Sequence, residues 1–221
     1  LRGDPEARRL LEYADRLKTV IGIDKDNKAR EAVARIRDYI GRGFNPIVYC
    51  RYIHTAKYIG KIFQEQFQDK KYKSLHIEVI TSELNDELRR EKIELMNGSL
   101  RRLLIATDCL SEGINLQEGF NAILHYDLPW NPNRLEQREG RIDRFGQRSP
   151  SVEVTLLYGS NNPIDGVVLE VLLRKAREIR KTIGISVPFP ENSASVMEAV
   201  TNAILLKPQI SIKQQERQLT L

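Results

Sequence analysis

The stretch "LLIAT", residues 103–107, is a nearly continuous apolar run rather than an alternating one. "PIVYC" at 46–50 and "AILHY" at 122–126 have the same character. Strands that helices cover on both faces have this composition, because neither face meets water. Together with "HIEVI" at 76–80 and "VEVTLLY" at 152–158, these runs predict five short strands.

Helical patterns lie between these runs. In "DNKAREAVARIRDYIGRG" (26–43), apolar residues recur on one face, Asp26 or Asn27 can cap the helix, and Gly41 or Gly43 can end it. The segment "HTAKYIGKIFQEQF" (54–67) has the same periodicity. These patterns predict two amphipathic helices, whose apolar faces consist of Ala29, Val33, Ile36 and Ile40 in the first and Ala56, Ile59, Phe63 and Phe67 in the second.

Two further helices are expected. "LNDELRREKIELMNG" (84–98) places Leu84, Leu88 and Leu95 on one flank and ends in Asn-Gly, a good C-cap. A long helix is expected over 161–184. Strands that alternate with helices of this length indicate βαβ units, so the sequence predicts an α/β fold with a parallel sheet. In such sheets, the functional residues lie at the carboxyl ends of the strands.

Composition limits the function only loosely. The 221 residues carry 35 Lys and Arg against 30 Asp and Glu, a net charge of +5, which mildly favours a polyanionic partner. Cys50, Cys109 and three histidines offer neither a disulfide framework nor a metal site, so we expect no metal bound by this chain and a reducing, cytoplasmic setting. No apolar run approaches the roughly 20 residues of a membrane span. Because the sequence lacks an initiator Met and its N-terminus is too charged for a signal peptide, we expect a fragment.

A phosphate-binding loop of the form GxxxxGK[ST] would let the chain hold a nucleotide by itself. Gly60-Lys61 is followed by Ile62, and position 55 is Thr, so this segment does not fit that pattern. Asp86 and Glu87 follow the strand run by several residues and suit a helix start better than a Mg²⁺ site. We therefore expect that the chain cannot hold a nucleotide alone.

The stretch "LEQREGRIDRFGQRS" (135–149) contains four arginines. A helix over 133–145 would place Gln137, Arg141 and Arg144 on one stripe, with Gly140 permitting close approach of another surface. Arginine stays charged and grips phosphate oxygens in a fixed fork, so such a stripe suits a triphosphate. A solvated basic helix, paired with its own neighbouring carboxylates, is the alternative that spacing alone leaves open.

Five segments, taken together, resemble motifs of superfamily 2 helicases of the Snf2 branch. "QREGRIDRFGQ" is similar to motif VI, "ATDCLSEGINLQ" (106–117) to motif V, and "PIVYCRY" to motif IV. "HYDLPWNPNRLEQ" (125–137) and "TSELNDELRREKIELMN" (81–97) resemble the connecting Snf2 segments. The "SEG" of motif V, where chromatin remodellers usually have Gly-Leu-Gly, is most similar to bacterial and archaeal Snf2 proteins, including the type that recycles RNA polymerase.

The resemblance implies the second RecA-like lobe of such an ATPase, a three-layer domain whose central, mainly parallel sheet is flanked by helices. It divides the chain into an N-terminal linker or helix (1–26), the lobe (27–160), a bracing helix (161–186), and a peripheral helix and tail (187–221). The phosphate loop, and with it most of the grip on ATP and Mg²⁺, would belong to a first lobe outside this sequence.

The resemblance also implies roles for individual residues. Arg141 and Arg144 would be arginine fingers for the γ-phosphate, and Gln137 would couple them to the inter-lobe cleft. The ribose and phosphate side of the nucleotide would meet three residues of motif V, Glu112, Gly113 and Asn115.

DNA phosphates would meet Thr107 and Ser111 of motif V and, on the same edge, Arg51, Ser82 and Arg89. For Thr107, the alternative is a strand-end hydroxyl satisfied within the lobe. For Arg89, it is a pair with Glu91, Glu94 or another surface carboxylate.

The expected function is the second motor lobe of an ATP-dependent double-stranded DNA translocase, part of a DNA-dependent ATPase and inactive when isolated. A lobe of an unwinding helicase and a non-catalytic nucleic-acid-binding scaffold are the alternatives. The expected partners are the first lobe, duplex DNA and RNA polymerase or another nucleoprotein complex, with no membrane. The expected location is the nucleoid in a prokaryotic cytoplasm.

Overall fold

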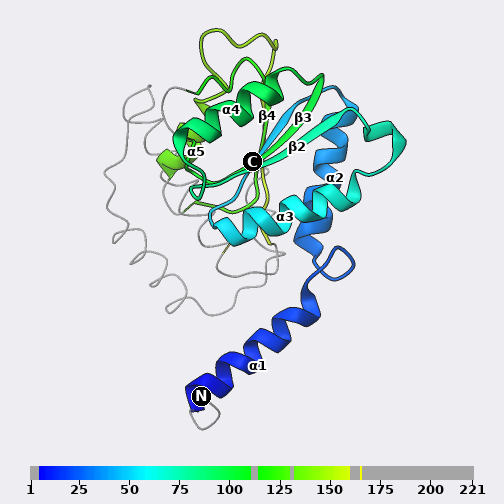
Figure 1. Cartoon of the computed structure of the whole chain (residues 1–221), viewed down its shortest axis with the longest axis vertical. Coiled ribbons are helices and arrows are strands. Elements are labelled where there is room, and N and C mark those ends of the chain that lie inside the picture. Colours follow the sequence, from blue (N-terminus) through cyan, green and yellow to red (C-terminus); the bar gives the residue numbers. More distant parts are fainter. Residues whose placement is uncertain (1–4, 111–113, 130–131, 160–164, 166–221) are drawn as a thin grey trace, which may run out of the picture.

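The computed structural model describes residues 5–110, 114–129, 132–159 and 165 (Figure 1). Five strands are present in this part of the chain, each within two residues of a predicted apolar run. The helices are α1 (Pro5–Val20), α2 (Asn27–Gly41), α3 (Ile53–Gln66), the 3₁₀ turn η1 (Lys70–Tyr72), α4 (Asp86–Asn97) and α5 (Pro132–Glu139). The strands are β1 (Pro46–Tyr49), β2 (Leu75–Ile80), β3 (Arg101–Ala106), β4 (Ala122–His125) and β5 (Glu153–Leu156).

The five strands form one sheet in the order β2-β3-β1-β4-β5, and every pairing is parallel. The most apolar strands, β3, β1 and β4, lie in its middle, as their composition predicted. Val48 of β1 is in register with Ile105 on one side and Leu124 on the other. All carboxyl ends therefore meet at one edge of the sheet, and all amino ends meet at the opposite edge.

Helices cover both faces of the sheet, which confirms the three-layer α/β fold (Figure 1). The cluster beneath α2 and α3 includes Ile36, Phe63, Val48 and Leu103. On the other face, Ile93 and Met96 of α4 pack with the alternate residues of the same strands. Successive strand residues point to opposite faces, so a continuous apolar run supplies both clusters.

Local signals set the helix ends. Asp26 caps α2 by accepting a hydrogen bond from the Ala29 amide at 2.9 Å, and Asn85 caps α4 in the same way. After α2 ends, Gly43 adopts a φ of +86°, a conformation that side chains other than glycine rarely adopt. The predicted apolar flank of α4 is wrong in part: Leu88 and Leu95 are exposed, and Ile93 and Met96 are buried in their place.

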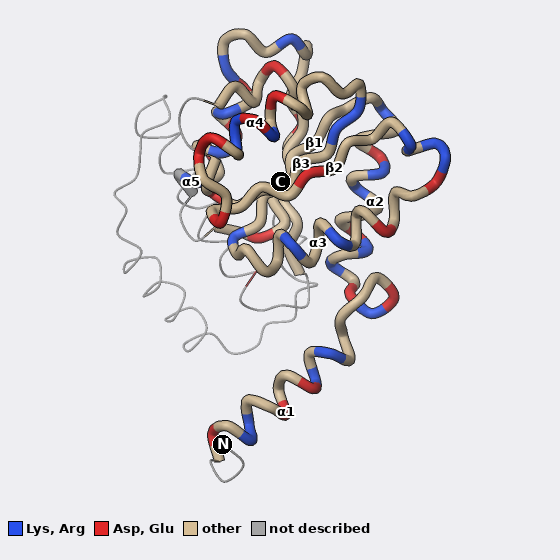
Figure 2. The backbone as a smooth tube through the Cα atoms, in the orientation of Figure 1, with Lys and Arg blue, Asp and Glu red and all other residues tan. Residues whose placement is uncertain are grey.

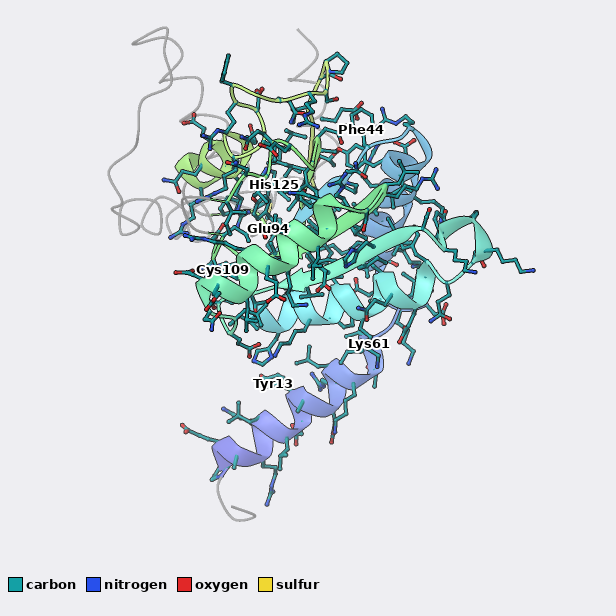
Figure 3. The ribbon with its side chains drawn as sticks, turned by 45° about the horizontal axis from the view of Figure 1, so that its top comes forward. Tyr13, Phe44, Lys61, Glu94, Cys109 and His125 are labelled. Carbon is teal, nitrogen blue, oxygen red and sulfur yellow. The ribbon has the colours of Figure 1, made fainter. Side chains whose placement is uncertain are left out.

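The helix α1 extends away from the lobe and buries none of its residues (Figure 1). The labelled Tyr13 illustrates this, since it lies on α1 apart from the body of the protein (Figure 3). Apart from Asp165, the bracing helix expected at 161–186 lies outside the described residues, as does the segment 187–221. Within the described ranges, no helix has the length and apolarity to cross a bilayer.

Candidate functional site

A pocket opens at the carboxyl edge of the sheet, where the chemistry of such folds is expected. Tyr49 ends β1 there, and Asp108 follows β3, so two neighbouring strands contribute to the pocket. The other side is formed by α5 and the turn after it. The full lining is Tyr49, Asp108, Leu110, Arg134, Gln137, Arg138 and Arg141. Three guanidinium groups and an amide facing one pocket suit the oxygens of an anion such as a phosphate.

The predicted helix over 133–145 is too long. The α-helix ends at Glu139, and residues 140–146 form turns. Ile142 causes the change of direction, because its side chain is fully buried in the cluster beneath α4. Gln147 fixes the turn, since its Nε2 donates to the carbonyl oxygens of Ile142 at 2.9 Å and Phe120 at 3.0 Å. Gly140 suits the helix end, where an added Cβ would lie 3.1 Å from the Glu136 carbonyl oxygen.

The predicted finger residues are therefore not on one helical stripe. Gln137 and Arg141 both line the pocket, with Arg141 half-buried. Arg144 is exposed on the turn and does not line it, and Phe145 beside it is fully exposed. The structure thus brings together two of the three residues predicted to be catalytic.

Asp108 and Arg138 form the ion pair on which the pocket is built. The Arg138 Nε and Nη2 atoms donate to the two carboxylate oxygens of Asp108 at 2.6 and 3.0 Å. The Arg138 side chain is only 3% exposed. Arg134, one turn earlier on α5, also donates to Asp108, at 3.3 Å. The ion pair therefore ties α5 to the loop after β3 in a fork geometry that only arginine offers.

On its other side, the Arg138 guanidinium contacts two buried rings, those of Tyr49 and His125. The guanidinium lies 5.1 Å from the centroid of the Tyr49 ring, and its Nη1 lies 3.3 Å from Nδ1 of His125. The Nε2 of His125 lies 3.4 Å from a carboxylate oxygen of Glu139. An Nδ1 that accepts from Arg138 implies the tautomer with its proton on Nε2, which then faces Glu139. His125 lies in the interior (Figure 3), where it packs among buried residues and also positions Arg138.

The local environment moves three pKa values. Burial alone would raise the pKa of Asp108, but the hydrogen bond and charge of Arg138, and then those of Arg134, outweigh it and lower the pKa. Burial lowers the pKa of His125, opposed in part by the nearby carboxylate of Glu139, and this favours the neutral ring. Burial raises the pKa of Tyr49. The site therefore keeps a carboxylate, a neutral imidazole and a phenol around one guanidinium.

Two buried hydroxyls at this edge lack a hydrogen-bond partner among the described residues. They are the hydroxyl of Tyr49, whose residue lines the pocket, and Oγ1 of Thr107. A buried polar atom without a partner costs about 1–3 kcal/mol, which a bound group could offset. The satisfied strand-end hydroxyl that was the alternative for Thr107 is not observed. An ATP phosphate fits these donors better than Mg²⁺ does, because Asp108 is already engaged by arginines.

The predicted DNA-binding residues lie along the same edge. Arg51 and Ser82 are exposed just after β1 and β2, and Thr107 directly follows β3. The guanidinium of Arg51 lies 5.1 Å from the Tyr52 ring centroid, while its backbone amide donates to Asp127. The topology thus places these three residues on neighbouring strand ends.

Arg89 is engaged within the lobe. Its Nη1 donates to Asp86 at 2.7 Å and to the Cys109 carbonyl oxygen at 2.8 Å, and its Nε donates to the Leu84 carbonyl oxygen. The carboxylate that pairs with it is therefore Asp86 rather than Glu91 or Glu94. These hydrogen bonds of Arg89 tie the start of α4 to the loop that contains Cys109.

Several predicted residues are less informative here. Ser111, Glu112 and Gly113 lie outside the described residues. Asn115 is exposed. Cys50 is buried and Cys109 partly buried, as expected of small core residues.

Sequence reasoning missed Asp108 and Arg138. A signal for each was available. Asp108 directly follows the apolar run 103–107, at the strand end where the functional residues of parallel sheets lie. Arg134 and Arg138 are four residues apart, so they share a helix face and can reach one carboxylate together.

The model of the helicase conserved C-terminal domain matches residues 29–146. An uncharacterized ATP-dependent helicase of Bacillus subtilis, YqhH, is 41% identical over 91 residues, which are 41% of this chain and 16% of that protein. The RNA polymerase-associated protein RapA of Proteus mirabilis is 38% identical over 33% of this chain and 7% of its own length. A probable ATP-dependent RNA helicase of Rattus norvegicus, DDX52, is 27% identical over 69% of this chain and 23% of that protein.

The fold is similar to that of solved helicase-type cores. The Sulfolobus solfataricus SWI2/SNF2 ATPase core in complex with dsDNA has a TM-score of 0.60 at 18% identity, over 85% of this chain and 37% of that one. Domain 2 of the DEAD-box helicase Mss116p, bound to an RNA duplex, has a TM-score of 0.55 at 18% identity. The match covers 79% of this chain and 65% of that one. The chain spans less than a quarter of the length of the relatives named above.

The family model covers more than half of the chain, and the fold agrees with it. The expected helicase C-terminal lobe is thereby confirmed at the level of the domain, and the resemblance to the Snf2 branch enters the proposed function. The chain belongs to the helicase conserved C-terminal domain family.

Proposed function

We propose that this chain is the second motor lobe of an ATP-dependent double-stranded DNA translocase of the Snf2 type. The observation that carries the proposal is the shared pocket of Gln137 and Arg141 at the carboxyl edge of the parallel sheet, built on the Asp108–Arg138 ion pair. A guanidinium that is half-buried and held near two further arginines is suited to a phosphate presented by another lobe.

In this proposal, a first lobe outside this sequence holds ATP and Mg²⁺, and the lobe described above closes on the nucleotide. Arg141 contacts the γ-phosphate from the pocket, and Arg144 reaches it from the exposed turn. The fully exposed Phe145 supports an approach of another surface to this turn, because large apolar side chains in such positions commonly mark contacts. Gln137 adds an amide contact, and Glu112, Gly113 and Asn115 meet the ribose and phosphate side.

Movement along DNA would follow from an ATP site that is divided between the two lobes. Closure and opening of the two lobes would shift the grip on one DNA strand, made by Thr107, Ser111, Arg51 and Ser82, with Arg89 fixing the loop between them. Such contacts with phosphates give position and salt dependence rather than sequence preference. The exposed side chains of Arg51 and Ser82, which follow the strands on either side of β3, support this grip.

The experiment uses a longer polypeptide that includes the ATP-holding lobe, and it measures ATP hydrolysis with duplex DNA, single-stranded DNA or RNA. Arg141→Ala and Arg144→Ala are expected to lower the duplex-stimulated rate by about 10³–10⁵, the range for loss of an arginine finger, with DNA affinity retained. Arg148→Ala is the matched control, since Arg148 is an exposed arginine of the same segment. Normal hydrolysis by both finger variants would refute the assignment.

A second candidate is the lobe of an unwinding RNA helicase. The observation in its favour is the similarity to DDX52 and to Mss116p. Stimulation of hydrolysis by RNA but not by duplex DNA, together with strand separation, would select it. The similarity to RapA supports a further proposal, an association with RNA polymerase at the nucleoid of a prokaryotic cytoplasm.

A further inference from the structure

A second basic surface lies on the opposite edge of the sheet from the pocket. It surrounds η1 in the loop between α3 and β2, and it includes the start of β3. The loop appears at the right-hand edge of Figure 2, where blue predominates. We call it the amino-edge patch, and it consists of Arg37, Lys70, Lys71, Lys73 and Arg101.

The amino-edge patch rests on a rigid aromatic floor. Tyr72 is 7% and Phe67 5% exposed, and their rings meet edge to face with centroids 4.7 Å apart. The Lys71 ammonium lies 4.9 Å from the Tyr72 ring centroid, within the range of a cation–π contact. Because Tyr72 is buried, it fixes the backbone of the loop and thereby the positions of Lys71 and Lys73 on either side of it.

Two further cations join the lysines from other elements. The Arg37 guanidinium, on α2, lies 5.8 Å from the Phe67 ring centroid. Arg101 donates from Nη1 to the carbonyl oxygen of Lys71 at 3.3 Å, which ties the start of β3 to the loop. Three segments distant in the sequence thus place cations around one pair of rings.

The charge of the amino-edge patch is not neutralised within the lobe. None of its five cations forms an ion pair with a carboxylate in the described part of the chain, although many other exposed cations do. Asp69 is the one carboxylate of the segment 69–74. Cations kept together without partners repel one another, so a surface of this kind favours a polyanion.

We infer that the amino-edge patch binds the phosphate backbone of duplex DNA as a second site. The inference rests on the proposed function, since a motor that tracks duplex DNA meets this polyanion continuously. The aromatic rings are buried, which leaves no surface on which bases could stack, so the contact is made by cations with phosphates and does not read sequence.

The DNA phosphates at the amino-edge patch are distinct from those at the carboxyl edge. A strand of six residues such as β2 spans about 20 Å, which is roughly the distance between the two edges. The phosphates at the amino-edge patch therefore lie about 20 Å or more from those at the carboxyl edge, on the same duplex or on another segment.

The test measures binding of this chain to a fluorescently labelled 20-base-pair duplex of random sequence by anisotropy, between about 25 and 200 mM salt. Lys70→Glu/Lys71→Glu/Lys73→Glu is expected to weaken binding at least tenfold and to lower the slope of log affinity against log salt by about 2–3, at about 0.9 per lost phosphate contact. Lys18→Glu/Lys25→Glu/Lys61→Glu is the matched control, because these exposed lysines lie elsewhere and change the net charge equally.

The outcomes separate the two proposals. Equal affinity and salt slope in the two triple variants, with weakened binding by Arg51→Glu, would overturn the second site and leave the proposed function intact. A wild-type chain that binds no duplex would count against both. If Lys70→Glu/Lys71→Glu/Lys73→Glu lost binding to RNA but kept binding to duplex DNA, duplex DNA would be the wrong partner for the amino-edge patch. Circular dichroism confirms that each variant is folded.

Discussion

The residue on which the pocket depends most is Arg138, although no motif assigned it a role. Its guanidinium is buried and fixed by Asp108 on one side and by Tyr49 and His125 on the other. A charge placed at such depth needs a partner, since unpaired buried charges are strongly unfavourable. We infer that Arg138 is a positioning residue, which sets where its neighbours Gln137 and Arg141 lie.

This role gives a prediction for stability. Asp108→Ala leaves the Arg138 guanidinium without a carboxylate, and breaking a buried ion pair in this way lowers the free energy of unfolding by about 3–5 kcal/mol. Urea denaturation of the chain measures the change. Asp143→Ala removes an exposed carboxylate from the same segment and is expected to stay within about 0.5 kcal/mol of the wild type. A similar small change in Asp108→Ala would show that the ion pair has no structural importance.

Sequence could not reveal this ion pair, because 30 residues separate its partners and only the sheet topology brings them together. Arg141 and Gln137 were predicted from motif spacing, and both line the pocket. The side-chain orientation of Arg144 was predicted incorrectly, since it depended on a helix that the burial of Ile142 interrupts. Motifs therefore identified candidate residues, while packing decided which of them share a pocket.

Among the elements, α3 shows how a glycine can imitate a motif. Gly60-Lys61 resembles the end of a phosphate loop without matching the rest of that pattern, and the structure places Gly60 in the buried face of α3. A Cβ on Gly60 would collide with the side chain of Val79 on β2. The glycine is therefore required for close approach of the helix to the sheet.

Gly60→Ala is expected to destabilise the lobe by about 1–3 kcal/mol, the usual cost of overpacking a core. Alanine also favours a helix over glycine by about 1 kcal/mol, which offsets part of that cost. Replacing Val79 with Ala in the same chain removes the collision, so the double variant should lose less stability than the sum of the single variants. A strictly additive double-mutant cycle, measured by urea denaturation, would contradict the proposed contact.

Strands and helix caps were more predictable than helix faces. In an α/β fold, a short apolar run between helical patterns predicts a strand. The five strands lie where such runs occur in the sequence. Asp26 and Asn85 cap their helices through local hydrogen bonds, which sequence can reveal. The buried face of α4 depends on how the helix packs on the sheet, and its two exposed leucines, Leu88 and Leu95, made the apolar pattern ambiguous.

Taken together, the lobe divides its proposed work between two edges of one sheet. In the two proposals, the carboxyl edge offers arginines to a nucleotide and a first set of contacts to DNA, and the amino edge offers a second set of cations to DNA. Neither edge supplies a phosphate loop, and the carboxylate of the pocket is occupied by Arg138 and Arg134. In the proposed function, the chain contributes groups that act on a bound nucleotide rather than groups that bind it first.

The purified chain is accordingly expected to hydrolyse no ATP above the buffer rate, with or without duplex DNA. Adding the phosphate-loop lobe as a separate polypeptide should restore DNA-stimulated hydrolysis if the lobes associate, and Arg141→Ala should abolish the restored activity. A coupled assay for phosphate release measures both, and Arg148→Ala again serves as the control. Hydrolysis by the isolated chain that survives Arg141→Ala would mean that the catalytic nucleotide site lies elsewhere in these 221 residues, and the division of labour between two lobes would be wrong.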